Sequence, residues 1–198
     1  LMAHGFYTPP RLHYDPIKGH GRPFHYYTYG TCLIETTVDC LRGTYKIDAS
    51  RIVHDLGRTI IPTVDKGQIE GGLAQGLGWV TLEELSFNDE GHLLSDALST
   101  YKAPDAEFMP DVMELNLLEN VDNLGGPLGS KAVGEPPFMY GIAAFFAIRN
   151  AINEFKEIDD LGKEIHCPIT AEQALLLLYP NFAHAEKSYN ASLVKESV

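Results

Sequence analysis

The hydrophobic and polar positions of the chain follow several different periods, and each period predicts a different element. Tyr, Thr, Ile and Val are frequent in residues 24–39 and 45–54, and a glycine-containing turn at residues 41–44 separates the two runs. Runs of β-branched and aromatic residues around such a turn predict a β-hairpin or meander. The preceding stretch, residues 6–23, is rich in proline and glycine and predicts a loop.

Apolar residues then recur at helical spacing. They predict one helix that continues to residue 85, with Asp65 as its N-cap. These apolar positions are Ile69, Leu73, Leu77 and Val80. Five glycines lie in the same stretch, between residues 67 and 78, and each costs about 1 kcal/mol relative to alanine in a helix. We therefore expect a buried helix whose glycines allow another backbone or a ligand to approach closely.

Shorter signals occupy the middle of the chain. Residues 87–94 have Asn-Asp-Glu-Gly at their centre, which predicts a strand, a turn and a second strand. Residues 101–110 contain two prolines and predict a proline-rich connection. Residues 112–118 predict a further strand.

Two helices are expected in the last third of the chain. Residues 139–155 carry a broad apolar face, and residues 170–178 form a second helix with Thr170 as its N-cap. The apolar face consists of Ile142, Phe145, Phe146, Ile148, Ala151, Ile152 and Phe155. Residues 183–198 are expected to form a polar, mobile tail. Strands and helices in mixed order, together with hairpin signals, predict the α+β class.

Composition narrows the possible partners and the compartment. A net charge of −12 with a pI near 5.0 argues against nucleic acid or an anionic membrane as the main partner. Three widely spaced cysteines, Cys32, Cys40 and Cys167, argue against a disulfide framework or a zinc knuckle and favour a reducing, cytoplasmic location. No signal-peptide pattern is visible, and the longest apolar run, residues 138–148, is too short to span a bilayer.

Glu135 is the strongest candidate for chemistry because it lies between Gly134 and two prolines. Pro136 restricts its own φ and biases Glu135 toward an extended backbone. One interpretation is a structural carboxylate that forms a salt bridge with Lys131. The other is a general base, which requires a pocket that excludes water. The residues alone leave the two interpretations evenly balanced.

Three further groups of residues carry possible chemistry. Gln68, at the start of the glycine-rich helix, could lie beside an anion bound by free N–H groups, although close helix packing through the glycines is an equal alternative. The eight histidines are scattered without ligand spacing, so a metal held directly by side chains is not expected. Asp105, Glu107 and Asp111 could belong to a glycosidase pair, but a solvated loop is the favoured interpretation.

Taken together, several segments resemble the xanthine dehydrogenase/aldehyde oxidase family of molybdenum hydroxylases. They occur in the order found in that family and extend over residues 5–180. The matching segments are residues 67–78, 81–85, 99–104 and 130–137. Two more, residues 21–27 and 54–58, are most similar to the bacterial xanthine dehydrogenase molybdenum-binding subunit. Each segment alone would be a weak signal, but the set is specific.

The resemblance implies that residues 1–182 are the C-terminal portion of a molybdopterin-binding domain, with mixed sheets and packed helices. It also implies that Glu135 is the general base, which takes a proton from a hydroxyl on molybdenum. That hydroxyl then attacks an electron-poor carbon of a purine, xanthine or hypoxanthine. Gln68 is expected to hydrogen-bond around the cofactor. The residues expected to lie against the cofactor are Lys131, Ala132, Val133 and Gly134.

The resemblance further implies that the chain, which opens on Leu1, is part of a larger enzyme. The upstream half of the molybdenum domain, the 2Fe-2S clusters and FAD are expected on other domains or subunits of an oligomer. We therefore expect the isolated chain to be inactive and free of metal. Two alternatives are a non-catalytic structural or interaction module and a hydrolase. The hydrolase would pair Glu135 with a second buried acid within about 10 Å.

Overall fold

The computed structural model describes residues 2–10, 12–119, 121–157 and 165–182. The predicted tail, residues 183–198, lies outside the described residues.

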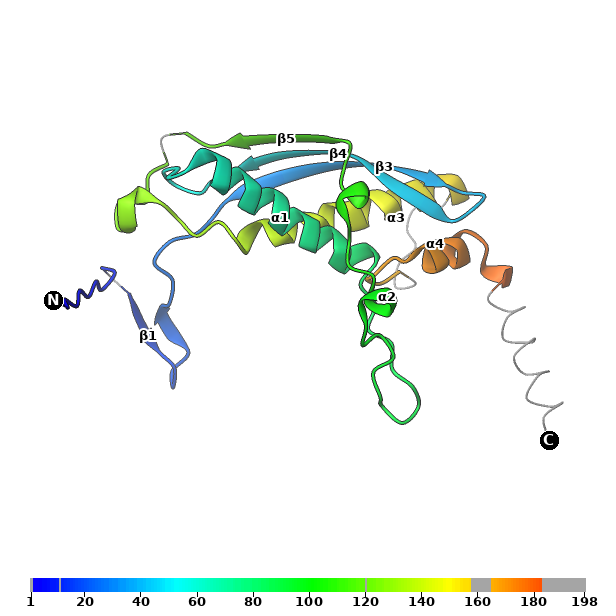
Figure 1. Cartoon of the computed structure of the whole chain (residues 1–198), viewed down its shortest axis with the longest axis horizontal. Helices are drawn as coiled ribbons and strands as arrows, with labels where there is room; N and C mark the ends of the chain where they lie inside the picture. Colours follow the sequence, from blue (N-terminus) through cyan, green and yellow to red (C-terminus); the bar gives the residue numbers. More distant parts are fainter. Residues whose placement is uncertain (1, 11, 120, 158–164, 183–198) are drawn as a thin grey trace.

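A three-stranded sheet forms one layer of the molecule (Figure 1). Its strands are β3 (Gly30–Asp39), β4 (Thr44–His54) and β5 (Val112–Leu117), in the order β3-β4-β5. β3 and β4 are antiparallel, whereas β5 runs parallel to β4. The hairpin and the third strand predicted from the sequence are therefore confirmed, and the described residues have the expected α+β character.

The first strand of the hairpin is shorter than predicted, because β3 begins at Gly30 and residues 24–29 lie outside the sheet. Aromatic residues make this segment resemble a strand, but two of its side chains, Phe24 and Tyr27, are exposed and pack edge to face on each other. The turn after β3 closes as expected, since Asp39 accepts a hydrogen bond from the N–H of Leu41 at 3.0 Å.

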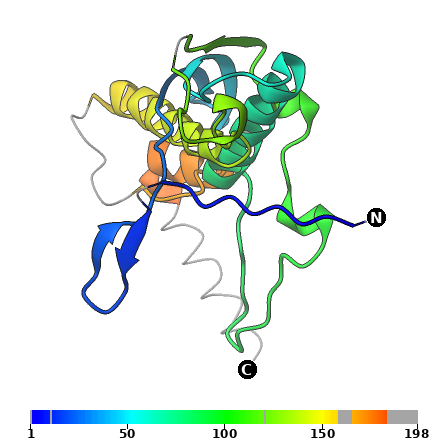
Figure 2. The same ribbon diagram turned by 90° about the vertical axis from the view of Figure 1, so that its left-hand side faces the viewer.

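The prediction that residues 6–23 form only a loop is wrong. They contain a small hairpin of β1 (His13–Asp15) and β2 (His20–Arg22). Asp15 closes its turn by accepting hydrogen bonds from the N–H groups of Ile17 and Lys18 at 3.0 and 3.1 Å. Both views show this hairpin projecting from the body of the molecule (Figures 1 and 2).

Two helices, α1 (Pro62–Thr81) and α3 (Ile142–Lys156), pack on the same face of the sheet (Figure 2). A 3₁₀ segment, η3 (Pro136–Gly141), leads into α3. The last helix, α4 (Ala171–Leu178), follows the predicted cap, since the Thr170 hydroxyl accepts a hydrogen bond from the N–H of Gln173 at 3.2 Å.

The start of α1 differs from the prediction. The helix begins at Pro62 with Ile61 as N-cap, so Asp65 lies in the first turn. Proline suits this first position because the N–H that it lacks would have no partner inside the helix. Asp65 still supports the helix start, because its carboxylate accepts a hydrogen bond from the N–H of Ile60 at 3.0 Å. The helix ends at Thr81, earlier than the predicted residue 85.

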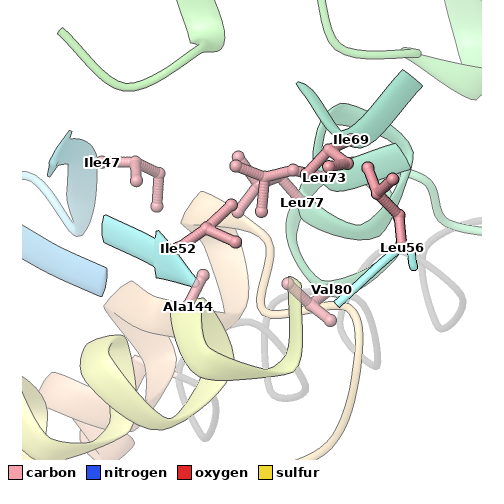
Figure 3. Packing of buried hydrophobic residues seen from close by; sticks show 8 residues of the cluster. All are labelled: Ile47, Ile52, Leu56, Ile69, Leu73, Leu77, Val80 and Ala144. Carbon is pink, nitrogen blue, oxygen red and sulfur yellow. The ribbon is translucent and has the colours of Figure 1, made fainter. Parts of the chain in front are cut away.

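The core lies between the sheet and the two long helices (Figure 3). All four predicted apolar positions of α1 are fully buried there. The main cluster consists of Ile47, Ile52, Leu56, Ile69, Leu73, Leu77, Val80 and Ala144. A second cluster joins α3 to α4 and contains Ile148, Ile152, Ile165, Ile169, Ala174 and Leu178.

The predicted face of α3 is wrong in part. Phe146 and Phe155 are 45% and 50% exposed, and Ala144 is buried instead. In the middle of the chain, the predicted strand–turn–strand is reduced to one bridge between Phe87 and Leu93. The short helix α2 (Leu98–Tyr101) and the 3₁₀ segment η1 (Ala106–Phe108) complete this region.

Candidate functional site

Backbone contacts between α1 and η3 bring together segments that are far apart in the sequence. A Cβ at Gly76 would overlap the carbonyl oxygen of Phe138, and a Cβ at Gly141 would overlap the backbone of Gly76. A Cβ at Gly72 would lie 3.1 Å from the carbonyl oxygen of Gly134. Because no side chain intervenes, the loop that carries Glu135 lies directly against α1.

The glycine prediction is thus confirmed for Gly72 and Gly76. It also holds for Gly78, where a Cβ would lie 2.7 Å from the ring of Pro104. At Gly67 and Gly71 no atom of the described residues lies within 4 Å of a Cβ built there, so no backbone approaches these two glycines and the alternative of a ligand stays a prediction.

The same crossing places Gln68 beside the loop. Gln68 is exposed on α1, and a Cβ at Gly134 would lie 3.3 Å from its side-chain oxygen, Oε1. Gln68 lies in the second turn of α1 and not at its start, so the hypothesis of an anion at a helix N-terminus beside Gln68 is wrong. What Gln68 offers is its side-chain amide, which can donate and accept hydrogen bonds.

The loop beside Gln68 exposes backbone donors. Within the described residues, the N–H groups of Val133, Gly134 and Glu135 have no hydrogen-bond partner, whereas the N–H of Ala132 donates to the hydroxyl of Tyr26 at 2.8 Å. Gly134 adds no side chain, so this stretch of backbone is accessible. The side chain of Val133 is half-buried and packs against the main core.

Glu135 itself departs from the expected backbone. It is exposed and has φ −92° and ψ −39°, a helical and not an extended conformation. The reason is that Glu135 is the N-cap of η3, and its carbonyl oxygen accepts a hydrogen bond from the N–H of Phe138 at 3.0 Å. Local 3₁₀ hydrogen bonding therefore outweighs the steric preference imposed by Pro136.

An open hollow of about 450 Å³ lies beside the Glu135 carboxylate. Its lining consists of Tyr26, Thr28, Ala132, Gly134, Glu135 and Pro136. Glu135 is exposed to this hollow, so the described residues alone do not exclude water from it.

The structural interpretation of Glu135 as a partner of Lys131 is wrong. The Lys131 ammonium instead forms a buried ion pair with Asp55, in which the two side chains are 10% and 5% exposed. It also donates a hydrogen bond to the carbonyl oxygen of Tyr27 at 2.9 Å. The second Asp55 oxygen accepts a hydrogen bond from the N–H of Gly57 at 2.9 Å. The Lys131 charge is therefore buried and paired with Asp55 and not with Glu135.

Next to Asp55, the fully buried side chain of His54 forms a second polar contact. Its Nδ1 lies 2.6 Å from the hydroxyl of Tyr140, and the two rings meet edge to face. Burial lowers the pKa of His54, and the Lys131 charge lowers it further, whereas Asp55 opposes the shift. Burial also raises the pKa of Tyr140 to about 12, with contributions from Cys32 and Asp55. Both side chains are therefore neutral near pH 7.

Asp55 and Tyr140 were not singled out as site residues from the sequence. A signal for Asp55 was available, since it lies within the matching segment at residues 54–58. The aromatic partner Tyr140 carried no such signal.

The remaining candidates behave as solvated groups. Asp105 caps η1 by accepting hydrogen bonds from the N–H groups of Glu107 and Phe108 at 3.0 Å, and Asp111 pairs with Lys46 on the surface. The favoured interpretation of this loop is thereby confirmed. Among the described residues the only buried acid is Asp55, and its charge is neutralised by Lys131, so the structure offers no support for a hydrolase pair.

No group of three or more His, Cys, Asp or Glu side chains in the described part of the chain is placed to hold a metal ion. Its three cysteines are free thiols. Within the described ranges, no helix combines the length and apolarity needed to cross a membrane.

A model of the family described as molybdopterin cofactor-binding domain matches residues 1–110. The chain belongs to this family. The match includes Gln68 and Asp55 and ends before the loop that carries Glu135.

Xanthine dehydrogenases are similar to this molybdopterin cofactor-binding chain over most of its length. Xanthine dehydrogenase 2 of Arabidopsis thaliana is 38% identical over 192 residues, which is 92% of this chain and 14% of that protein. Xanthine dehydrogenase of Oryza sativa is 44% identical over 160 residues, 77% of this chain and 12% of that protein. The chain thus spans a small part of the relatives that it matches. The resemblance to the xanthine dehydrogenase/aldehyde oxidase family is confirmed.

Solved molybdenum enzymes agree with this result. The aldehyde oxidoreductase from Desulfovibrio gigas superimposes with a TM-score of 0.63 and 32% identity, over 83% of this chain and 17% of that chain. The carbon monoxide dehydrogenase from Oligotropha carboxidovorans has a TM-score of 0.67, with 80% of this chain and 19% of that chain covered. At 22% identity, the latter comparison shows the fold alone.

The exposed groups near Gly134 fit a pterin cofactor. A pterin carries ring nitrogens and oxygens that donate and accept hydrogen bonds. Here it would meet one side-chain amide and three backbone N–H groups that have no partner among the described residues. A side chain at position 134 would fill the space beside Gln68, since a Cβ there would lie 3.3 Å from Gln68 Oε1. Because residue 134 is glycine, this space is open to the cofactor. A metal bound through such a cofactor does not need a cluster of protein ligands.

Proposed function

We propose that this chain forms one side of the molybdenum cofactor site in a larger oxidoreductase of the xanthine dehydrogenase type. The observation that carries the proposal is the placement of Gln68, Gly134 and Glu135 on one exposed surface, across the glycine contacts between α1 and η3. The proposed reaction is the hydroxylation of a purine, xanthine or hypoxanthine, with oxygen derived from water. The purine assignment is supported by the names of the relatives, which are xanthine dehydrogenases.

In this proposal the cofactor is held by neutral hydrogen bonds. The Gln68 amide and the backbone N–H groups of Val133 and Gly134 bind it, and the exposed Ala132 lies beside it. Lys131 contributes by holding the loop in place, because its ammonium is occupied by Asp55 and by the Tyr27 carbonyl. When bound, the cofactor supplies a metal centre that accepts the electrons removed from the substrate.

Glu135 acts as the general base. Its carboxylate accepts the proton released as the new carbon–oxygen bond forms, which requires a fixed position close to the substrate. The 3₁₀ segment that starts with two prolines provides a rigid backbone for this purpose. Since Glu135 is exposed in this chain, the surface that excludes water from it must come from the rest of the enzyme.

The proposed partners follow from that requirement. The upstream half of the molybdenum domain would cover the hollow beside Glu135, and domains or subunits with 2Fe-2S clusters and FAD would carry the electrons away. Several large apolar side chains are available for such contacts. Exposed examples are Ile61, Val64, Leu124, Leu128 and Met139.

The decisive experiment is the substitution Glu135→Gln in the complete enzyme. We expect molybdenum content and KM to remain near wild type, while kcat falls by about 10²–10⁴-fold, the usual contribution of a general base. Glu154→Gln, at an exposed position of α3, serves as the matched control and should retain full activity. Near-normal turnover in Glu135→Gln would contradict the assignment.

A second candidate function is a non-catalytic module that completes a larger subunit. The exposure of Glu135 favours it, because a base in contact with bulk water is poorly suited to this reaction. Molybdenum analysis after co-expression with the upstream half separates the two candidates. Uptake of the metal supports the enzyme, and its absence from a well-formed complex supports the module.

A further inference from the structure

The loop that carries Glu135 is held at both ends by adjacent residues at the end of one strand. We propose that His54 and Asp55, which follow one another where β4 ends, are positioning residues for Glu135. The loop comprises residues 131–140. The inference rests on the proposed function for its catalytic consequence, but its structural content can be tested separately.

Asp55 holds the first end of the loop. Its carboxylate pairs with the Lys131 ammonium in a buried setting, and the N–H of Lys131 donates to the carbonyl oxygen of Leu56 at 2.8 Å. Lys131 is therefore attached to the end of β4 through both its side chain and its backbone. Removing the Asp55 charge would leave a buried ammonium with no counter-charge among the described residues, held by the Tyr27 carbonyl and the face of the Tyr29 ring, which is strongly unfavourable.

His54 holds the second end. Its Nδ1 lies 2.6 Å from the hydroxyl of Tyr140, the residue before the last position of η3. Gly30 on β3 leaves the space for this hydroxyl, because a Cβ at Gly30 would overlap it. The contact therefore depends on both strands of the hairpin, although only His54 makes the polar interaction.

Between these two anchors the loop has few hydrogen bonds of its own. The N–H groups of Val133, Gly134 and Glu135 have no partner in the described part of the chain, and the first bond of η3 begins at Phe138. The position of Glu135 thus depends on the anchors at each end and on the glycine contacts with α1. Loss of the contact at either anchor would therefore displace the Glu135 carboxylate. A displacement of about 1 Å can reduce turnover by about 10²-fold.

Hydrogen–deuterium exchange tests the structural part in the complete enzyme. The amides of Lys131 and Phe138 are the reporters, since each donates a hydrogen bond that depends on one end of the loop. In Asp55→Asn we expect exchange at Lys131 to accelerate about tenfold or more, the effect of leaving a buried partner unsatisfied. Asp111→Asn, which breaks the exposed pair with Lys46, is the matched control and should leave both amides unchanged.

Gly30→Ala probes the second anchor without changing His54 or Tyr140. The added methyl displaces the Tyr140 hydroxyl, so exchange at Phe138 should accelerate while exchange in α4 stays at its wild-type rate. If Asp55→Asn does not yield folded enzyme, the positioning role is tested with Tyr140→Phe alone, which removes the hydroxyl that contacts His54. Unchanged exchange at both reporters, or an equal acceleration throughout the molecule, would overturn the positioning role.

Kinetics tests the catalytic consequence. In Asp55→Asn and Tyr140→Phe, kcat should fall about tenfold or more while KM and molybdenum content stay near wild type, because the carboxylate is displaced but not removed. Asp55→Glu, which keeps the charge, should recover part of kcat. Altered exchange with wild-type kcat would overturn the positioning role. Full activity of Glu135→Gln would instead overturn the proposed function and leave the exchange result intact.

Discussion

At the scale of single residues, Glu135 shows how local hydrogen bonding can change an expectation based on sterics. Pro136, which follows it directly, predicts an extended backbone for Glu135, yet the residue caps a 3₁₀ segment with helical angles. Its carboxylate is exposed, and Lys131, the expected partner, is paired elsewhere. The combination leaves the carboxylate available for chemistry while its backbone is restrained.

His54 leads to a prediction about acid stability. Burial holds its pKa below the ordinary value of about 6.5, so the unfolded chain binds more protons than the folded chain as the pH drops. The free energy of unfolding should therefore be largest above about pH 6.5 and decrease as the pH falls through this value, by at most about 1.4 kcal/mol per pH unit for one group. Urea denaturation between pH 7.5 and 5.5 measures this slope.

The variant His54→Gln provides the comparison. Its side chain does not titrate, so the slope between pH 7.5 and 5.5 should be smaller than in the wild type. The charged neighbours Asp55 and Lys131 are present in both proteins. Identical slopes in the two proteins would show that His54 does not control the acid sensitivity.

At the scale of elements, the crossing of α1 and η3 is the contact that brings the candidate site residues together. Gly72 and Gly76 allow the backbone of η3 to lie on the helix without intervening side chains. The sequence predicted that these glycines serve a close approach, because a helix with five glycines is otherwise unfavourable. It did not predict which segment approaches, since Gly76 and Gly141 are far apart along the chain.

Alanine substitutions at different glycines of α1 should change the free energy of unfolding in opposite directions. Gly76→Ala places a methyl where the Phe138 carbonyl lies, so the free energy of unfolding should fall by about 1–3 kcal/mol. Gly67→Ala faces open space and should raise it by about 0.5–1 kcal/mol through the better helix propensity of alanine. Thermal or chemical denaturation of the two variants gives the comparison. Equal effects would indicate that Gly76 is not in tight contact.

Much of the element content could be predicted because it depends on local patterns. The hairpin, the strand near residue 112, the buried stripe of α1 and the Thr170 cap all follow from spacing and turn chemistry. The errors arise where long-range packing overrides the local pattern. Periodicity predicts a broad apolar face that includes Phe146 and Phe155, yet the buried stripe of α3 is the narrower one of Ala144, Ile148 and Ile152, spaced by four residues.

At the scale of the whole molecule, the described residues present many large apolar side chains to solvent. Ile61, Leu98, Leu124 and Phe146 are examples. A surface of this kind suits a domain that packs against other parts of a larger protein. The small share of the relatives that the chain spans, 14% or less for the two plant proteins, agrees with this interpretation.

The isolated chain should therefore be incomplete in function. We expect it to contain no stoichiometric molybdenum and to show no hydroxylase activity, because Glu135 and Gln68 lie on an open surface. Elemental analysis and an activity assay with xanthine check both points. The upstream half, added by co-expression, should restore metal content. A purified isolated chain that contains molybdenum and turns over xanthine would contradict the expectation.

The site could be predicted only in part from the sequence. The resemblance assigned candidate roles to Gln68 and Glu135, and the structure brings Gln68 to the loop of Glu135. The contacts that hold this loop were missed because they join residues 76 and 86 positions apart, Asp55 with Lys131 and His54 with Tyr140. Pairings over such distances leave no periodic signal in a single sequence.

The attachment of the loop to β4 has a consequence for the dimensions of the site. Gln68 belongs to α1, whereas the anchors of Glu135 belong to the end of β4, and the core residues Ile52 and Leu73 lie between these two elements. The gap between the Gln68 amide and the Glu135 carboxylate therefore depends on two things, the direct backbone contacts at Gly72 and Gly76 and the spacing of α1 from β4 across the core. A change of volume at Ile52 or Leu73 would alter this gap without touching either group, so the proposed cofactor site is sensitive to substitutions inside the protein.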